Sequence, residues 1–274
     1  MTANRGSDDV SWWGKALGGA FGFMLGGPLG ALLGAALGHK LDQQVADGGS
    51  GHYDLGAQQR VQAVFFMATF SVMGHLAKAD GRVSESEIAV AQEVMGRMGL
   101  NPLLRKAAAR LFNQGKQPDF PLDDVLQQFK REVCQRRTLL QTFMEFLLMA
   151  AYADGRVQAA ERRLLQHISV RLGFDTREFD QIENMVRAGR RFDGGYRPRA
   201  QAPGGSMEDA YAVLGVPPQA NEEQIRKAYR RLLSQHHPDK LVARGLPEEM
   251  MKLASDRTHQ IRSAYEQIRR QRGF

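Results

Sequence analysis

The clearest local pattern in the chain lies at residues 221–240, which read NEEQIRKAYRRLLSQHHPDK. Asn221 followed by Gln224 has the capping-box spacing that begins a helix, since each side chain can accept a hydrogen bond from the other residue's backbone amide. Apolar residues then recur at helical spacing on one face. Pro238 cannot continue a helix and biases His237 away from helical dihedral angles, so the chain should turn there. The apolar face is Ile225, Tyr229, Leu232 and Leu233, and the opposite, basic face is Arg226, Lys227, Arg230 and Arg231.

A second amphipathic helix is expected from about Glu248 to Arg270. Its apolar stripe consists of Met251, Ala254, Ile261, Ala264, Tyr265 and Ile268. Two helices that pack through these stripes form a hairpin. The turn that contains residues 237–239 would then lie at an exposed tip.

These residues resemble the J-domain, the module that engages Hsp70 chaperones. The likeness begins at residues 209–216 (DAYAVLGV), includes 227–232 (KAYRRL) and 237–239 (HPD), and reaches 264–266 (AYE). Ala210 stands where a second aromatic is common, and Thr258 replaces a usual phenylalanine. These departures concern local packing.

The resemblance implies a mechanism in which this chain makes and breaks no covalent bond. In the J-domain family the basic helix docks on an acidic Hsp70 surface, and the His-Pro-Asp turn promotes ATP hydrolysis by the partner. A cationic face raises the encounter rate and fixes orientation, and a carboxylate at Asp239 suits a bidentate arginine contact. The implied Hsp70-binding residues are His237, Pro238, Asp239, Arg226, Lys227, Arg230, Arg231 and Lys240. A solvated basic face beside an ordinary turn is the alternative interpretation.

Composition sets broad limits on the other functions. The chain has 274 residues, enough for two domains, and a formal net charge of +7. That charge suits nucleic acid, an anionic membrane or an acidic protein, but no nucleic-acid module is recognisable, so we expect no nucleic-acid partner. Cys134 is the only cysteine, which excludes a disulfide within one chain and favours a reducing compartment. No nucleophile–base set or phosphate loop is present, so we expect no enzyme.

A long uncharged run near the start predicts a membrane span. Residues 16–38 hold 23 residues without a charge, and as a helix they would extend about 34 Å, enough for a hydrocarbon core of about 30 Å. Trp12 and Trp13 lie at one edge, where indoles prefer the membrane interface. A cleaved signal peptide, a Gly/Ala linker and a hairpin around Pro28 are the alternatives.

Glycines within and beside this run recur at every fourth position. Such a repeat leaves a groove along one helix face that allows two backbones to approach closely, so we expect a homodimer through the span. The glycines are Gly14, Gly18, Gly22, Gly26, Gly30, Gly34 and Gly38.

Flanking charges do not orient the span. Arg5 and Lys15 precede it and Lys40 follows it, so the positive-inside rule gives no answer. The need to reach a cytoplasmic Hsp70, together with the free cysteine, favours a short periplasmic N-terminus and a cytoplasmic remainder.

The middle of the chain predicts a helical bundle between two polar, glycine-rich segments, at 39–56 and 190–206. Residues 139–152 carry only one charged side chain, Glu145, and are too short for a second span, so they should form a buried core helix. The expected helices are 57–79, 85–98, 102–114, 122–134, 137–153, 159–172 and 176–189.

A sequence repeat at an offset of 74 residues lies within this bundle. Residues 79–83 (ADGRV) return at 153–157, which suggests two related helical hairpins. The pattern resembles the TerB-like (tellurite-resistance) helical domain. That resemblance implies a possible divalent-cation site, whose candidate ligands are Asp80, Glu87, Asp154 and Glu161. Helix ends and caps explain the same residues without metal, and no cofactor is otherwise expected.

Taken together, the chain resembles the DjlA-type membrane-anchored J-domain co-chaperones of bacteria. The expected fold is all-α, with a tail (1–15), a transmembrane helix (16–38), a tether (39–56), a TerB-like domain (57–189), a linker (190–206) and a J-domain (207–274). The resemblance implies a regulatory co-chaperone at the bacterial inner membrane that recruits DnaK (Hsp70) to membrane-associated clients. A metal or envelope-stress sensor that uses the J-domain as its output is the alternative.

Overall fold

The computed structural model describes residues 29, 56–79, 96, 100–133, 136–152, 157–192 and 206–274. Every regular element in these ranges is a helix, which confirms the all-α prediction. Except for Leu29, the predicted span and its glycines lie outside the described residues, as do Cys134 and the segment 80–95. Leu29 is buried, and its backbone amide donates to Gln128 Oε1 at 3.0 Å. Within the described part of the chain, no helix combines the length and apolar composition needed to cross a bilayer.

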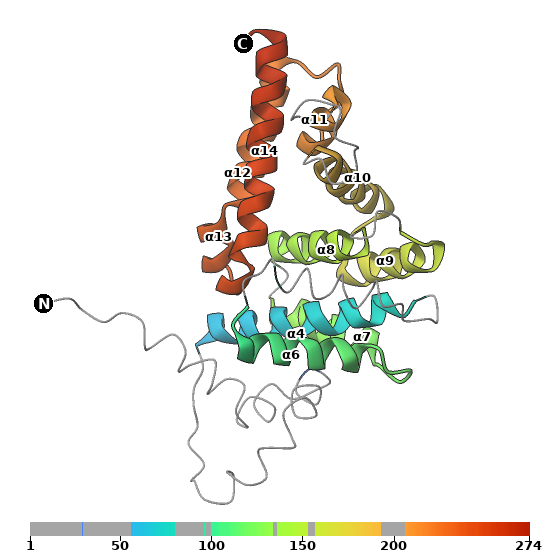
Figure 1. Ribbon diagram of the computed structural model, residues 1–274. Coiled ribbons are helices and arrows are strands. Elements are labelled where there is room, and N and C mark those ends of the chain that lie inside the picture. Colours follow the sequence, from blue (N-terminus) through green and yellow to red (C-terminus); the bar gives the residue numbers. More distant parts are fainter. Residues whose placement is uncertain are drawn as a thin grey trace, which may run out of the picture.

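The middle domain is built around one almost wholly buried helix, α4 (Ala57–Ala77). Around it lie five further described helices, and each begins at the residue that the sequence predicted. They are α6 (Pro102–Gly115), α7 (Leu122–Glu132), α8 (Arg137–Ala151), α9 (Ala159–Leu172) and α10 (Thr176–Phe192). Figure 1 shows α4, α6 and α7 at the base of the molecule, with α8 and α9 above them.

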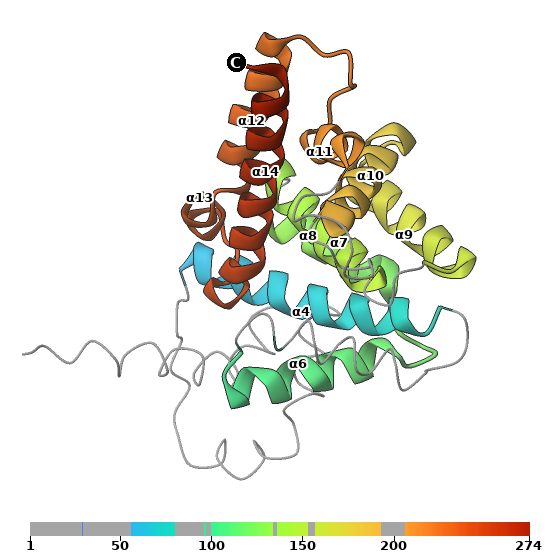
Figure 2. The same ribbon diagram turned by 45° about the horizontal axis from the view of Figure 1, so that its top comes forward.

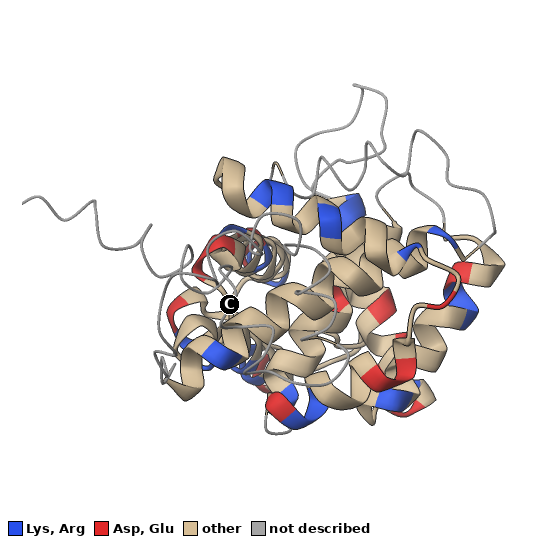
Figure 3. Ribbon diagram, turned by 90° about the horizontal axis from the view of Figure 1, so that it is seen from below, with Lys and Arg blue, Asp and Glu red and all other residues tan. Residues whose placement is uncertain are grey.

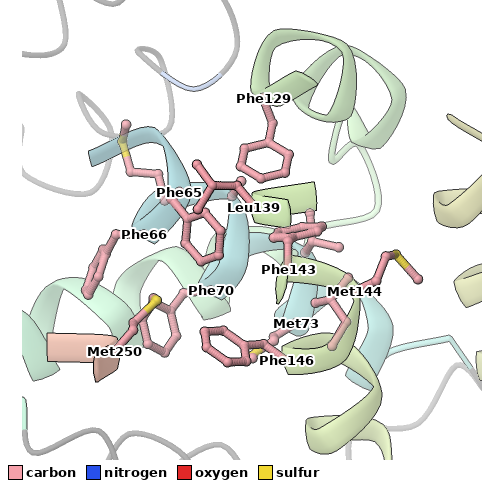
Figure 4. Packing of buried hydrophobic residues seen from close by; sticks show 14 of the residues in the cluster. Phe65, Phe66, Phe70, Met73, Phe129, Leu139, Phe143, Met144, Phe146 and Met250 are labelled. Atoms are coloured by element: carbon pink, nitrogen blue, oxygen red, sulfur yellow. The ribbon is translucent and has the colours of Figure 1, made fainter. Parts of the chain in front are cut away.

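Aromatic rings fill the centre of this domain. The Phe65 ring lies edge-on to the rings of Phe129 and Phe143, with ring centroids 5.7 and 6.0 Å apart (Figure 4). Offset and edge-on pairs of this kind add to the free energy of apolar burial. On the other side of α4, Gly74 lets α6 approach, because a Cβ there would lie 1.9 Å from the Phe112 carbonyl oxygen.

The C-terminal part forms the expected hairpin. Its elements are α11 (Met207–Leu214), α12 (Glu222–His236), the short α13 (Pro238–Ala243), a 3-10 turn η2 (Glu248–Met250) and α14 (Met251–Arg272). The two long helices, α12 and α14, lie side by side in Figures 1 and 2. Tyr229 and Tyr265 stack between them, with ring centroids 4.0 Å apart and planes 9° apart.

The prediction is wrong for one residue of the apolar stripe, Met251. Met251 begins α14 with an exposed side chain, whereas Met250 and Leu253 are buried. The stripe starts in the 3-10 turn at Met250 and continues at helical spacing through Ala254 and Ile261. Met251 lies one position away from this line and therefore faces solvent.

The apolar core of the J-domain is continuous with the middle domain. One cluster joins the middle domain to Leu241, Leu246, Met250, Leu253 and Ala254 of the J-domain. A second cluster joins the rest of the J-domain to Met185, Ala188 and Phe192 of α10. In Figure 4, Met250 lies among the aromatic rings of α4. The J-domain therefore packs against the middle domain at two places, the segment 241–254 and the face of α11 and α14 that meets α10.

Candidate functional site

The basic face of α12 forms as the sequence predicts. Ile225, Ala228 and Leu232 are buried against the rest of the J-domain. The four basic side chains are exposed: Arg226, Lys227, Arg230 and Arg231. Figure 3 shows how Lys and Arg are distributed with Asp and Glu over the ribbon. The exposed face is available to an acidic partner.

The helix starts where its capping box predicts. The Gln224 amide donates to Asn221 Oδ1 at 2.8 Å, and the Asn221 amide donates to Gln224 Oε1 at 2.9 Å. Near this end Arg226 forms an ion pair with Glu222 and lies 5.6 Å from the centroid of the Phe274 ring. These contacts fix the first turns of the basic face.

The turn after α12 is short and well defined. His237 is extended, at φ −62° and ψ 122°, and Pro238 immediately starts α13 at its first position, where no amide hydrogen is needed. Asp239 is 84% exposed, and its Oδ2 lies 4.0 Å from His237 Nδ1. Lys240 Nζ donates back across the turn to Ser234 Oγ at 2.9 Å. Asp239 is thus exposed at the turn as predicted, whereas His237 and Pro238 are half-buried between the two helices.

Thr258 explains one departure from the family pattern. Its hydroxyl lies 2.8 Å from the carbonyl oxygen of His236 and 3.0 Å from that of Ala254. The carbonyls of the last helical turn have no intrahelical partner. The hydroxyl therefore serves the end of α12 at the position where J-domains usually carry an apolar ring.

A buried charged cluster lies beneath the tip. Glu145 Oε2, from α8 of the middle domain, is 3.6 Å from His236 Nδ1 and 3.8 Å from Arg257 Nε. No side chain of the three is more than 5% exposed. Burial lowers the pKa of His236; Glu145 opposes that shift and Arg257 adds to it. We call Glu145, His236 and Arg257 the interdomain cluster.

Hydrogen bonds hold the segment after the tripeptide to the middle domain. Gln58 and Gln62 of α4 donate to the carbonyl oxygens of Val242 and Leu246, at 3.2 and 3.3 Å. Gly245 has φ +111°, and a Cβ there would lie 2.4 Å from Val61 Cγ1. The left-handed conformation and the close approach both require glycine at this position.

Arg244 completes the attachment of this segment. Its Nη1 donates to Thr138 Oγ1 at 2.9 Å, and its carbonyl oxygen accepts from Arg136 Nη1. Contacts therefore reach α13 and the turn that follows it from two parts of the middle domain, α4 and the start of α8.

The other end of the J-domain is fixed by an ion pair. Arg191 Nε, from α10, donates to Asp209 Oδ1 of α11 at 2.6 Å. Burial alone would raise the pKa of Asp209, but hydrogen bonds from Arg191 and Ser206 hold it below its usual value. Nearby, a Cβ on Gly189 would lie 2.6 Å from Gln260 Oε1, so α10 and α14 approach closely.

The sequence did not predict this attachment, although it offered one signal. Glu145 is the only charge in the segment 139–152, and a carboxylate in a core helix needs a partner. One of these partners, His236, lies 91 residues further along the chain. A pairing over so long a separation cannot be recognised from local sequence patterns.

The candidate metal ligands are mostly untested. Asp80, Glu87 and Asp154 lie outside the described residues. Glu161 caps α9 together with Gln158, whose amide donates to Glu161 Oε2 at 2.8 Å. Among the described residues, no group of three or more His, Cys, Asp or Glu side chains could hold a metal ion. The cation site stays a prediction.

Comparison with known families matches three consecutive segments of the chain. The sequence model of the co-chaperone DjlA transmembrane domain matches residues 10–60. That of the tellurite resistance protein TerB matches 66–184, and that of the DnaJ domain matches 209–272. The first of these indicates a membrane anchor.

Curated relatives match most or nearly all of the chain. The co-chaperone protein DjlA of Photobacterium profundum is 43% identical over an alignment of 276 positions that covers 96% of this chain and 99% of that protein. Its counterpart from Yersinia pestis is 42% identical over an alignment of 280 positions that covers 97% of this chain and 100% of that protein. That of Escherichia coli O157:H7 is 43% identical over 224 residues, 79% of this chain and 83% of that protein. No solved structure was found to match.

Proposed function

The chain belongs to the DjlA family of co-chaperones, and we propose that it recruits an Hsp70 chaperone of the DnaK type and stimulates its ATP hydrolysis near membrane-associated clients. The observation that carries this proposal is the position of Asp239. Its carboxylate is exposed at a stiff turn directly after the exposed basic face of α12. A co-chaperone role is established by the family, and no enzyme family is indicated by the comparisons.

The basic face of α12 and the tip make different contributions to the proposed function. The basic face supplies long-range attraction, which speeds association with an acidic surface and weakens as salt increases. The tip supplies a directed contact, because an exposed carboxylate can bind an arginine through two parallel hydrogen bonds. Pro238 restricts the backbone from which Asp239 projects. Hydrolysis itself takes place on the partner.

We also propose how the anchor is arranged. The anchor spans the inner membrane once, with the short N-terminus in the periplasm and the middle domain and J-domain in the cytoplasm, where a DnaK-type chaperone is found. The glycine repeat from Gly14 to Gly38 supports a homodimer through the span. A dimer would present two tips side by side to the chaperones that serve one client.

A single-turnover ATPase assay with a DnaK-type Hsp70 tests the proposal. The wild-type chain should accelerate hydrolysis, and both His237→Gln and Asp239→Asn should abolish most of the acceleration. His259→Gln is the matched control, since His259 is an exposed histidine of α14 outside the tripeptide, with its ring beside Ser263. Equal stimulation by the wild-type chain and both tip variants would disprove the proposal.

A further inference from the structure

We infer that the middle domain holds the tripeptide in position for Hsp70, with Glu145 as a positioning residue that acts through His236 and Arg257. The inference rests on the proposed function and adds a requirement to it. On this view the J-domain acts as a docked unit of the protein, and its tip is completed by a residue from another domain.

The first argument comes from buried charge. Glu145 is 4% exposed, and a carboxylate at that depth is stable only beside hydrogen-bond donors or cations. Gln141 Nε2 donates to its Oε1 at 2.9 Å, and the two groups beside Oε2, the His236 imidazole and the Arg257 guanidinium, both come from the J-domain. Separation of the domains would therefore leave charges of both signs without their partners. The cluster favours one docked arrangement over others.

The second argument concerns the residue before the tripeptide. His236 is held at two points: Thr258 bonds its carbonyl oxygen, and Glu145 lies beside its imidazole. The carbonyl and the side chain are thus fixed from α14 and α8, on different domains. Because the next residue is His237, any shift of His236 moves the tip.

The third argument concerns the residues after the tripeptide. The backbone carbonyls of Val242 and Leu246 accept hydrogen bonds from α4, and Gly245 packs directly on Val61. The tripeptide is therefore bracketed on both sides by contacts with the middle domain. Neither bracket exists in an isolated J-domain.

The docked arrangement leaves the functional groups open. Asp239 stays 84% exposed, and the basic residues of α12 face solvent. The middle domain instead contacts α13, the 3-10 turn and the first turns of α14, which follow the tip in the sequence. This geometry fits a support for the active tip rather than a cover over it.

The test separates recruitment from stimulation in the full-length chain, reconstituted in lipid nanodiscs. Single-turnover hydrolysis by a DnaK-type Hsp70 is measured over a range of co-chaperone concentrations. Glu145→Gln, which removes the charge and keeps the shape, should lower the maximal acceleration by about tenfold, since small misplacements can cost up to about 100-fold. The half-saturating concentration, set by the basic face, should change by less than about twofold.

Glu183→Gln is the matched control. Glu183 is another buried carboxylate of the middle domain, but its partners, Arg162 and Tyr152, belong to the same domain. It should leave the maximal acceleration unchanged. Equal maxima for wild type and Glu145→Gln, or equal losses in both variants, would overturn the inference.

Hydrogen exchange supplies a second readout in the same samples. The amides of Leu241, Arg244 and Leu246, which are hydrogen-bonded in α13 and its following turn, should exchange faster in Glu145→Gln, while those of α4 and α6 should not. Loss of protection in α4 and α6 as well would mean that Glu145→Gln disturbs the whole middle domain. His236→Gln is then used in its place, because it leaves Glu145 beside Arg257. If residues 237–246 exchange as in the wild type in whichever of the two variants keeps α4 and α6 protected, the inference is overturned. If the wild-type chain itself does not stimulate hydrolysis, the proposed function fails instead.

Discussion

Glu183 and Glu145 are buried to a similar depth in the middle domain, but they differ in whether their partners lie in the same domain or in the J-domain. Glu183 accepts hydrogen bonds from Tyr152 and from Arg162, each at 2.8 Å, and both partners lie in the same domain. Burial, followed by the hydrogen bond to Glu183, raises the pKa of Tyr152 to about 12. Glu145 Oε2 lies 3.6 Å from the His236 imidazole and 3.8 Å from the Arg257 guanidinium, both of which belong to the J-domain. The Glu183 site connects helices within the middle domain, whereas the Glu145 site connects the middle domain to the J-domain.

From this difference we expect the exposure of the partner to matter as much as its distance. Arg162 is 43% exposed and could be hydrated if Glu183 were removed. Arg257 is 5% exposed and has no such route to water. The longer contacts of Glu145 should therefore matter more for stability than the shorter ones of Glu183.

The largest effect is expected for Glu145→Ala. Removing one member of a buried ion pair costs about 3–5 kcal/mol of the free energy of unfolding, because a charge is left buried without compensation. Here the loss should appear in hydrogen exchange of the most protected amides of α14. A loss below about 1 kcal/mol would mean that the hydrogen bonds of Arg257 to Gln260 and to the Met185 carbonyl are sufficient, or that Arg257 reaches water.

A smaller loss, about 2 kcal/mol, is expected for Glu183→Ala. Hydrogen bonds to charged groups contribute about 1.5–3 kcal/mol each, and hydration of the freed guanidinium offsets part of this. Exchange of α9 and α10 amides measures the change, and α13 serves as the internal control. If Glu183→Ala costs more than Glu145→Ala, the argument from partner exposure is wrong.

The two sites should also respond to different ranges of pH. The pKa of His236 is below its ordinary value of 6.5 in the folded chain. The unfolded chain therefore binds more protons just below pH 6.5, so the contribution of this site is complete above that pH and declines as pH falls. The pKa of Glu183 is below its ordinary value of 4.5, because hydrogen bonds from Arg162 and Tyr152 outweigh the opposing effect of burial. Its contribution is complete above 4.5 and is lost only as pH falls further.

Thermal unfolding between pH 7.5 and 5 tests this contrast. The wild-type Tm should fall over that interval, and the fall should be smaller in His236→Gln. Glu183→Gln should keep the wild-type dependence in the same interval. An identical slope in wild type and His236→Gln would exclude His236 as the titrating group.

The smallest effect is expected at the edge of the Glu183 site. Asp180 Oδ1 lies 3.1 Å from Arg162 Nη2, with both side chains more than 40% exposed. Exposed pairs contribute less than about 1 kcal/mol, so Asp180→Ala should cost less than about 0.5 kcal/mol in chemical denaturation. A larger cost would show that Asp180, Arg162 and Glu183 act as one network.

Local patterns in the sequence predicted most of the helices, the exposed basic face of α12 and the exposure of Asp239. These patterns depend on neighbours within a few positions. They are the capping box at Asn221, the helix break at Pro238 and the helical spacing of the apolar and basic residues between them. Such signals can be read directly, and the structure confirms them. Met251 failed because a 3-10 turn moved the start of the stripe by one residue, which helical periodicity alone does not predict.

The docking of the J-domain could not be predicted in the same way. It depends on pairs that are distant in the sequence, such as Gln62 with Leu246 and Glu145 with His236. Glycines at 189 and 245 permit close approach, but a glycine in the sequence does not say what approaches it. The isolated charge of Glu145 signalled that a partner exists and left the partner unidentified.

The position of α13 on the first turns of α4 has a consequence for height above the bilayer. Gln58 bonds to Val242 only two residues after Gly56, where the described part of the middle domain begins. With the span proposed at 16–38, the tether predicted at 39–56 would limit the distance between the tip and the membrane to about 60 Å if it were fully extended. Residues added between 193 and 205 would leave that height unchanged, whereas residues added before position 56 would raise it. In that arrangement the distance between the membrane and the tip would be set by a segment near the start of the chain, although the tripeptide lies near its end.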